Sequence, residues 1–181
     1  ITNCKLVGMP NAASTSSFRA VIYLSNNAVN KNVTIENNEI LNGASGVYAQ
    51  GSSSNRGDSL IVSNNNIEGF HYYGIYSYYQ NSSMLNENLI KDGNTYTSPR
   101  GIYALYNIPM EITSNEVYIG GSSAPNGMYL DYNDGTPADP VIISNNMISM
   151  YTSASGTVTG MEVYNAEYNV VANNSIAVYG G

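Results

Sequence analysis

The sequence predicts an all-β fold in which the chain winds into a parallel solenoid of about six to seven turns, with three strands in each turn. Three observations predict it. A short segment with a fixed Asn recurs about every 27 residues, and a second motif that begins with Gly recurs between its copies. Asn, Ser, Gly and Tyr dominate the composition, which is typical of strands joined by tight turns.

The first strand of each repeat is an alternating apolar segment. Its copies are residues 33–40, 60–67, 83–90, 110–117, 141–148 and 169–176. Alternation directs Val33 and Ile35 inward, where each stacks on the like residue one turn away. A bend follows, and a short second strand begins at Ile40 or its equivalent. One position of the bend is Asn in all six copies: Asn38, Asn65, Asn88, Asn115, Asn146 and Asn174.

The third strand begins at a Gly that is followed by an apolar residue and usually by Tyr. The copies are residues 46–48, 74–76, 101–103, 127–129 and 160–162, with a degenerate first copy at 20–23. Two turn-rich insertions, 51–58 and 134–140, are expected to form loops on one edge. The remaining connections leave no room for a crossover helix, so successive strands must stack as turns of a parallel coil.

The composition also restricts the partners. Only 10% of the residues are charged, and the formal net charge is -7 with a pI of about 4.4, so we expect no nucleic-acid partner. We expect no membrane insertion, since no long apolar run is present. Residues 1–181 are expected to form one domain. The repeat is already running at Ile1, so we expect a portion of a longer protein that continues into further turns or a capping domain.

These residues resemble the right-handed parallel β-helix proteins of the pectate lyase-like superfamily. The resemblance rests on the alternating strand, the Asn bend with its Ile, and the Gly-Ile-Tyr strand, and it covers essentially the whole chain. It implies a right-handed coil in which the six bend Asn residues stack as an internal ladder. A carboxamide suits this place because it carries both donors and an acceptor for buried backbone groups. Cys4 takes the equivalent place in the first turn, so we expect the ladder to be absent or incomplete there.

The superfamily contains lyases, hydrolases, phage spikes and adhesins, so the fold implies little about activity. Its lyases commonly use Lys or Arg beside acidic Ca²⁺ ligands, and its hydrolases use clustered Asp residues and often a Gly-flanked His. His71 lacks flanking glycines, and Asp131 with Asp134 departs from a calcium-loop spacing. Lys91 and Arg100 flank a loop that would best place a base beside a sugar acid. We predict no catalytic residue, no metal site and no cofactor.

Two other features remain as hypotheses. The tripeptide Arg56, Gly57 and Asp58 lies in the first insertion and would present two charges at a loop tip, although such short matches arise often by chance. The tyrosines of the third strand are expected to point outward as a stripe, because their neighbours point inward. This stripe would either bind a glycan or a surface protein, or simply stabilise an exposed sheet. Its members are Tyr48, Tyr76, Tyr78, Tyr103 and Tyr129.

Two functions follow from these features. The first is a non-catalytic extracellular or cell-surface module, such as an adhesin, a stalk or a scaffold that binds glycans or proteins. The alternative is part of a polysaccharide lyase or glycoside hydrolase that acts on an acidic polysaccharide. The first is favoured, because acidic polysaccharide cleavage needs a base and charge neutralisation at one place. We accordingly expect the protein to be secreted or held at the cell surface.

Overall fold

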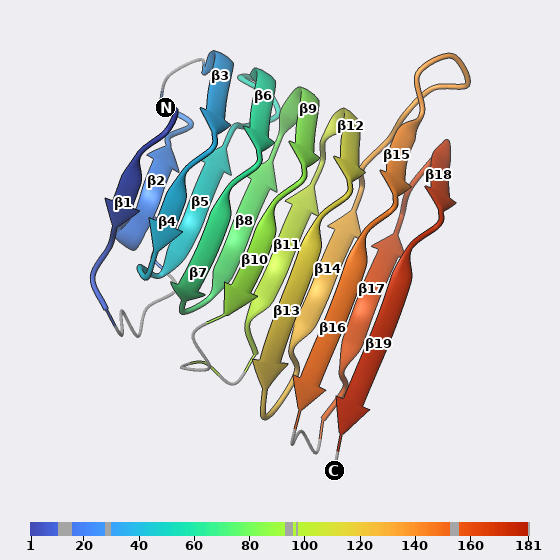
Figure 1. The fold of residues 1–181 in the computed structure, drawn as a ribbon. Coiled ribbons are helices and arrows are strands. Elements are labelled where there is room, and N and C mark those ends of the chain that lie inside the picture. Colours follow the sequence, from blue (N-terminus) through green and yellow to red (C-terminus); the bar gives the residue numbers. More distant parts are fainter. Residues whose placement is uncertain (11–15, 28–29, 93–95, 97, 153–155, 181) are drawn as a thin grey trace.

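The computed structural model describes residues 1–10, 16–27, 30–92, 96, 98–152 and 156–180. The chain forms three parallel sheets that we call A, B and C (Figure 1). Sheet A has six strands: β3 (Lys31–Glu36), β6 (Gly57–Ser63), β9 (Gln80–Asn86), β12 (Ile108–Thr113), β15 (Val141–Ser144) and β18 (Asn169–Ala172). Sheet B has seven: β1 (Lys5–Val7), β4 (Glu39–Leu41), β7 (Asn66–Phe70), β10 (Leu89–Asp92), β13 (Glu116–Gly121), β16 (Met147–Thr152) and β19 (Ser175–Gly180). Sheet C has six: β2 (Ala20–Leu24), β5 (Ser45–Gln50), β8 (Tyr73–Tyr78), β11 (Arg100–Leu105), β14 (Asn126–Asp131) and β17 (Thr159–Tyr164).

The chain visits the sheets in the order C, A, B in every turn, so each strand pairs with the strand three elements earlier. The register keeps the repeats aligned, as where Ile40 pairs with Ile67 and Ile67 with Ile90. Almost all the regular structure is strand; within the described residues the one helix is the short 3₁₀ turn Ser17–Arg19. The predicted all-β parallel solenoid with three strands per turn is confirmed.

The core is the stack of inward residues from the three sheets. Ile35, Val62, Leu85 and Ile112 form one column on sheet A and are fully buried. Comparable columns come from sheets B and C, and all of them join in one apolar cluster. Burial of such side chains stabilises a fold by about 1.5–3 kcal/mol each.

The corner between sheets A and B is made by a single residue in the left-handed region, followed by the Asn of the repeat. Asn37, Asn64, Glu87, Ser114, Asn145 and Asn173 hold this corner position, with φ between 54° and 57°. Asn adopts this conformation more readily than most residues, which explains the recurrent Asn-Asn pair.

The predicted asparagine ladder is confirmed. The backbone N–H and the Nδ2 of Asn38 donate to Oδ1 of Asn65 at 3.0 and 2.9 Å, and the same pair of bonds recurs at each step up to Asn174. Cys4 donates only its backbone N–H to Asn38 Oδ1, at 3.0 Å, and its side chain is exposed. The row of carboxamides therefore begins at Asn38, as expected.

The corner between sheets C and A holds a second, shorter ladder that we did not predict. Asn107 donates its backbone N–H and its Nδ2 to Asn133 Oδ1, each at 2.9 Å. The backbone N–H of Gln80 donates to Asn107 Oδ1 at 2.9 Å. All three side chains are buried. They lie six residues after Gly74, Gly101 and Gly127, so this constant offset is the signal that could have revealed them.

The last strands expose apolar side chains, among them Val171 at 52%, Ile176 at 47% and Val178 at 50% exposure. Continuation of the chain or a capping domain remains a prediction.

No helix within the described ranges has the length and apolar character needed to cross a bilayer.

Candidate binding face on sheet C

The outer surface of sheet C carries the predicted tyrosines. Tyr48, Tyr76, Tyr103 and Tyr129 lie in register on four neighbouring strands, while the residue before each of them is fully buried. Tyr78 lies two residues further along β8 and also faces outward. The structure therefore brings the five predicted residues onto one face.

The rings of this tyrosine row stack on one another. Centroid distances are 4.2 Å between Tyr48 and Tyr76, 5.7 Å between Tyr76 and Tyr103, and 4.9 Å between Tyr103 and Tyr129, with planes inclined by 16–20°. Each inner ring is thus covered on both faces by its neighbours. A ligand would therefore meet ring edges and phenol hydroxyls, and not open ring faces.

A second outward row lies three residues before the first. Arg100 and Tyr73 pair in register with each other and lie beside the tyrosine row. The in-and-out alternation of side chains is broken at the intervening glycine, because the Cβ position of Gly101 and the side chain of Ile102 both face the interior. The guanidinium carbon of Arg100 lies 4.4 Å from the ring centroid of Tyr103, 5.9 Å from that of Tyr129 and 5.7 Å from that of Tyr72. This is the geometry of a cation held over aromatic rings, which fixes the arginine on the face.

That glycine is required by packing. A Cβ on Gly74 or Gly101 would point inward and overlap a branched side chain of sheet B, Ile90 or Val117. The carbonyl oxygen of the next glycine in the column would also be in the way. The glycine column therefore lets sheet C close on sheet B. Because the glycine position turns inward, the residue before it lies on the outer side of the sheet, where Tyr73 stays buried among neighbouring rings.

A third group of rings occupies the corner between sheets C and A. Tyr79, Tyr106 and Tyr132 have positive φ and stack at 4.8 Å, with planes inclined by 12° and 2°. Arg56 lies 5.0 Å from the ring centroid of Tyr79 and donates from Nη1 to the carbonyl oxygen of Tyr106. This stack was not predicted from the sequence, although each of its members directly precedes a member of the second ladder.

Among the described residues, two carboxylates lie with Arg100 at the edge of this face: Asp131 at the end of β14, and Glu162, which pairs in register with Tyr129. Burial raises the pKa of Tyr73 and of Tyr76 well above the usual phenol range, and it raises the pKa of Tyr48 and of Tyr103 as well. These hydroxyls therefore stay protonated at neutral pH and can both donate and accept hydrogen bonds. Asn126, next to Arg100 in register, has a buried Oδ1 with no hydrogen-bond partner among the described residues.

The residues considered for catalysis do not come together. Lys91 lies on sheet B, 5.8 Å from the ring centroid of Tyr118, whereas Arg100 lies on sheet C. His71 is buried against Tyr96, with ring centroids 4.7 Å apart, and burial lowers its pKa. The intervening loop contains residues 93–95 and 97, which lie outside the described residues.

The acidic residues considered for calcium are engaged elsewhere. Asp131 Oδ1 accepts from Asn165 Nδ2 at 3.1 Å, and Asp134 Oδ1 accepts from the backbone N–H of Glu167 at 3.0 Å. Within the part of the chain that the structure describes, no three His, Cys, Asp or Glu residues lie close enough to hold a metal ion.

The charged tripeptide is not displayed at a loop tip. Gly57 and Asp58 belong to β6, so the first insertion is shorter than expected and ends at Arg56. Gly57 is buried against Gln80, and Arg56 is held by Tyr79 and Tyr106. The hypothesis of two charges presented at a loop tip is wrong, because Gly57 and Asp58 lie in a strand and the ring stack holds Arg56.

Comparison with known proteins identifies a family. A family model described as right handed beta helix region matches residues 20–181. No curated protein and no solved structure matches the chain.

Proposed function

The chain belongs to the right-handed beta helix family, and from that premise we propose that it is a non-catalytic, secreted or cell-surface module that binds glycans along the outer face of sheet C. The fold supplies a rigid, repetitive support and no activity of its own, so the function must come from a surface. The observation that carries the proposal is the row of stacked tyrosines with Arg100 set over it.

The chemistry of this row suits a polyhydroxylated chain. Stacking fixes the rings without further loss of side-chain freedom when a ligand binds. The protonated hydroxyls of Tyr103 and Tyr129 lie one strand spacing apart and offer donors and acceptors in a line. Arg100 adds a planar donor group that is already oriented by the rings.

A lyase or hydrolase would need an acid or base together with charge neutralisation at one place. Lys91 and Arg100, which we considered for this role, lie on different sheets. The guanidinium group of Arg100 is surrounded by the rings of Tyr72, Tyr73 and Tyr103. This arrangement favours a binding role over cleavage.

The test is a glycan array that compares the parent protein with a Tyr103→Phe, Tyr129→Phe double variant. Phe keeps the ring stack and removes only the hydroxyls, so we expect binding to fall by about tenfold or more, since each lost hydrogen bond is worth about 0.5–1.5 kcal/mol. Tyr168→Phe, which changes an exposed tyrosine outside both the row and sheet B, serves as the matched control. Equal binding by the parent and the double variant would reduce the row to a structural feature of the sheet.

A further inference from the structure

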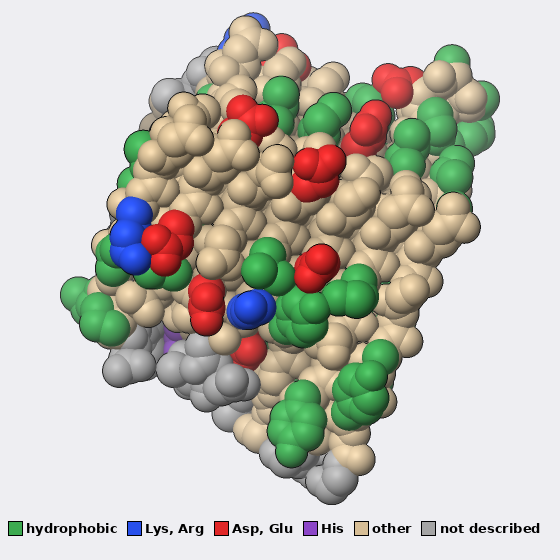
Figure 2. All heavy atoms as spheres, viewed as in Figure 1, with side chains coloured by type: hydrophobic (Ala, Val, Ile, Leu, Met, Phe, Trp, Pro, Cys, Tyr) green, Lys and Arg blue, Asp and Glu red, His purple; other side chains and the backbone are tan. Residues whose placement is uncertain are grey.

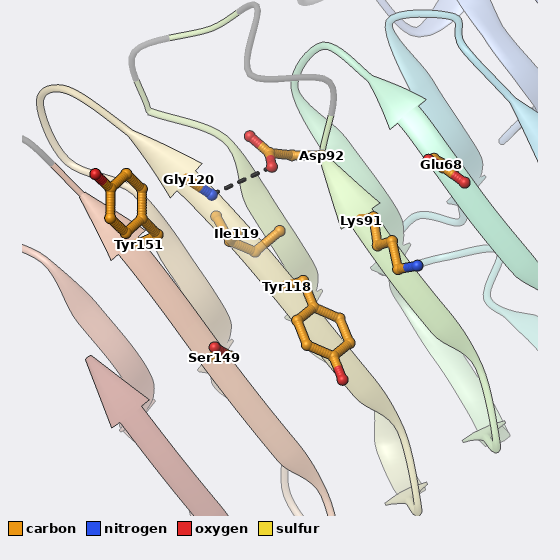
Figure 3. A pocket seen from close by; sticks show the side chains of 8 residues that line it. All are labelled: Glu68, Lys91, Asp92, Tyr118, Ile119, Gly120, Ser149 and Tyr151. Carbon is orange, nitrogen blue, oxygen red and sulfur yellow. Dashed lines mark hydrogen bonds between the residues drawn. The ribbon is translucent and has the colours of Figure 1, made fainter. Parts of the chain in front are cut away.

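The outer face of sheet B is separate from the proposed glycan face and contains a hollow of about 390 Å³. Figure 2 shows this face as largely uncharged polar side chains and backbone, with small separate groups of hydrophobic, acidic and basic side chains. The side chains that line the hollow come from β7, β10, β13 and β16 (Figure 3). They are Glu68, Lys91, Asp92, Tyr118, Ile119, Gly120, Ser149 and Tyr151.

The hollow exists because small residues occupy the surface between large ones. Tyr118 pairs in register with Ser149, and Gly120 pairs with Tyr151. Gly120 and Ser149 therefore form a low floor, and the two tyrosines form walls on opposite sides of it (Figure 3). A second hollow of about 370 Å³ shares Tyr118 and Ser149 and extends towards β19. Together they form a trough across neighbouring strands.

Two tyrosines of this trough, Tyr151 and Tyr179, differ from the inner tyrosines of sheet C in that their rings are exposed. Tyr151 is 75% exposed and Tyr179, its neighbour in register, is 58% exposed. Neither ring contacts another aromatic ring among the described residues, whereas the inner rings of sheet C are covered on both faces. An open ring face is what the apolar face of a sugar packs against.

The charges of the trough select against a polyanion. Lys91 is its one cation among the lining residues, and it stands beside two carboxylates, Glu68 in register with it and Asp92 next in the chain. Asp92 Oδ1 accepts from the backbone N–H of Gly120 at 3.2 Å, which fixes this carboxylate at the rim (Figure 3). Fixed charges and a hydroxyl around a small floor can orient the hydroxyl groups of an uncharged ligand.

We propose that the trough on sheet B is a second carbohydrate site, specific for a neutral oligosaccharide. A sugar ring packs on the exposed face of Tyr151, and its hydroxyls bond to Ser149, Lys91 and Asp92. The next sugar extends over Ser149 towards Tyr179. An acidic polysaccharide is disfavoured because its carboxylates would meet Glu68 and Asp92.

The test is native electrophoresis of the whole chain in gels that contain a neutral polysaccharide, namely xyloglucan, galactomannan or hydroxyethylcellulose, with polygalacturonate as the acidic comparison. We expect at least one neutral gel to retard the parent protein and polygalacturonate to leave it unaffected. Tyr151→Ala should weaken that retardation at least fivefold. Ser149→Gln, which fills the floor, should do the same. Tyr164→Ala changes a similarly exposed tyrosine on sheet C and should have no effect.

The outcomes separate this site from the one on sheet C. The Tyr103→Phe, Tyr129→Phe double variant should keep the retardation by neutral polysaccharides, so failure of the sheet C proposal would not alter this result. The proposal is overturned if no neutral gel retards the parent, if polygalacturonate alone does so, or if Tyr151→Ala behaves like Tyr164→Ala. Circular dichroism of each variant verifies that the strands are retained.

Discussion

The carboxamide of Asn88 uses its full hydrogen-bonding capacity of two donors and two acceptor positions. Its Nδ2 donates to the carbonyl oxygen of Val62 at 2.8 Å and to Asn115 Oδ1 at 3.0 Å. Its Oδ1 accepts from the backbone N–H and the Nδ2 of Asn65 at 3.1 and 3.0 Å. One carboxamide thus satisfies buried groups of two neighbouring turns, which no apolar residue of similar size could do.

Replacing Asn88 by Leu should lower the free energy of unfolding by about 2–4 kcal/mol, because at least two buried polar groups lose their partners at about 1–3 kcal/mol each. Urea unfolding followed by circular dichroism measures the change. Asn86→Leu is the matched control, since Oδ1 of Asn86 has no hydrogen-bond partner among the described residues. Equal loss of stability in both variants would contradict the ladder's energetic role.

Glu87 occupies the corner position with φ 56°, where four of the other turns use Asn. Glu has no side-chain interaction that favours the left-handed region, whereas Asn tolerates it. Glu87→Asn should therefore raise the free energy of unfolding by about 0.5–1 kcal/mol. Glu111→Asn, at an exposed position within β12, should give no gain. A thermal melt of the two variants beside the parent measures this, and no difference between them would argue against backbone strain at the corner.

Within each turn, the strand of sheet C packs against the strand of sheet B through its glycine. Gly46, Gly74, Gly101, Gly127 and Gly160 each have a branched side chain of sheet B where a Cβ would lie. The glycine column thus sets the distance between sheets B and C. The absence of a side chain at these positions is as important to the fold as the apolar columns are.

Gly101→Ala should destabilise the protein by about 1–3 kcal/mol, because the new methyl group would overlap Val117 and the carbonyl oxygen of Gly127. Gly180→Ala is the control, since the nearest atom to its added Cβ would lie 3.5 Å away, an ordinary contact. Denaturant titration of both variants should show a lower midpoint for Gly101→Ala alone. A Gly101→Ala protein as stable as the parent would mean that the sheets can move apart freely.

The whole molecule should be sensitive to alkaline pH through its buried tyrosines. Burial raises the pKa of Tyr73 and Tyr76 in the folded state, whereas the unfolded chain ionises near the ordinary value of about 10. The stability contributed by the neutral phenols is therefore complete below pH 10 and is lost as the pH rises above it. Urea unfolding between pH 8 and pH 11.5 should show this decline.

A Tyr73→Phe, Tyr76→Phe double variant should lose less stability over the same pH range, since Phe does not ionise. The absorbance of phenolate near 295 nm gives an independent measure, because the folded protein should ionise fewer tyrosines at pH 11 than the urea-unfolded chain does. A double variant with the same pH dependence as the parent would contradict the assignment to these two residues.

Much of this architecture could be predicted from the repeat. The column from Asn38 to Asn174 predicted the ladder, and the glycine motif predicted which tyrosines share a face. The second ladder at Gln80, Asn107 and Asn133 was missed because only two of its three members are Asn. The ring stack at Tyr79 and its equivalents was missed because a left-handed corner leaves no apolar pattern in the sequence.

The sequence by itself determined the solenoid, the inward columns and the row of outward tyrosines, because a repeat of nearly constant length places like residues in register one strand spacing apart. Only the tertiary structure decided how those rings are used. Register fixes where a ring lies and not which way its plane turns, since the plane depends on neighbours from other turns. For this reason the rings of sheet C cover one another, whereas the ring of Tyr151 keeps an open face. Tyr151 pairs with Gly120 on the neighbouring strand and lies two residues after Ser149 on its own strand, and both of these neighbours are small.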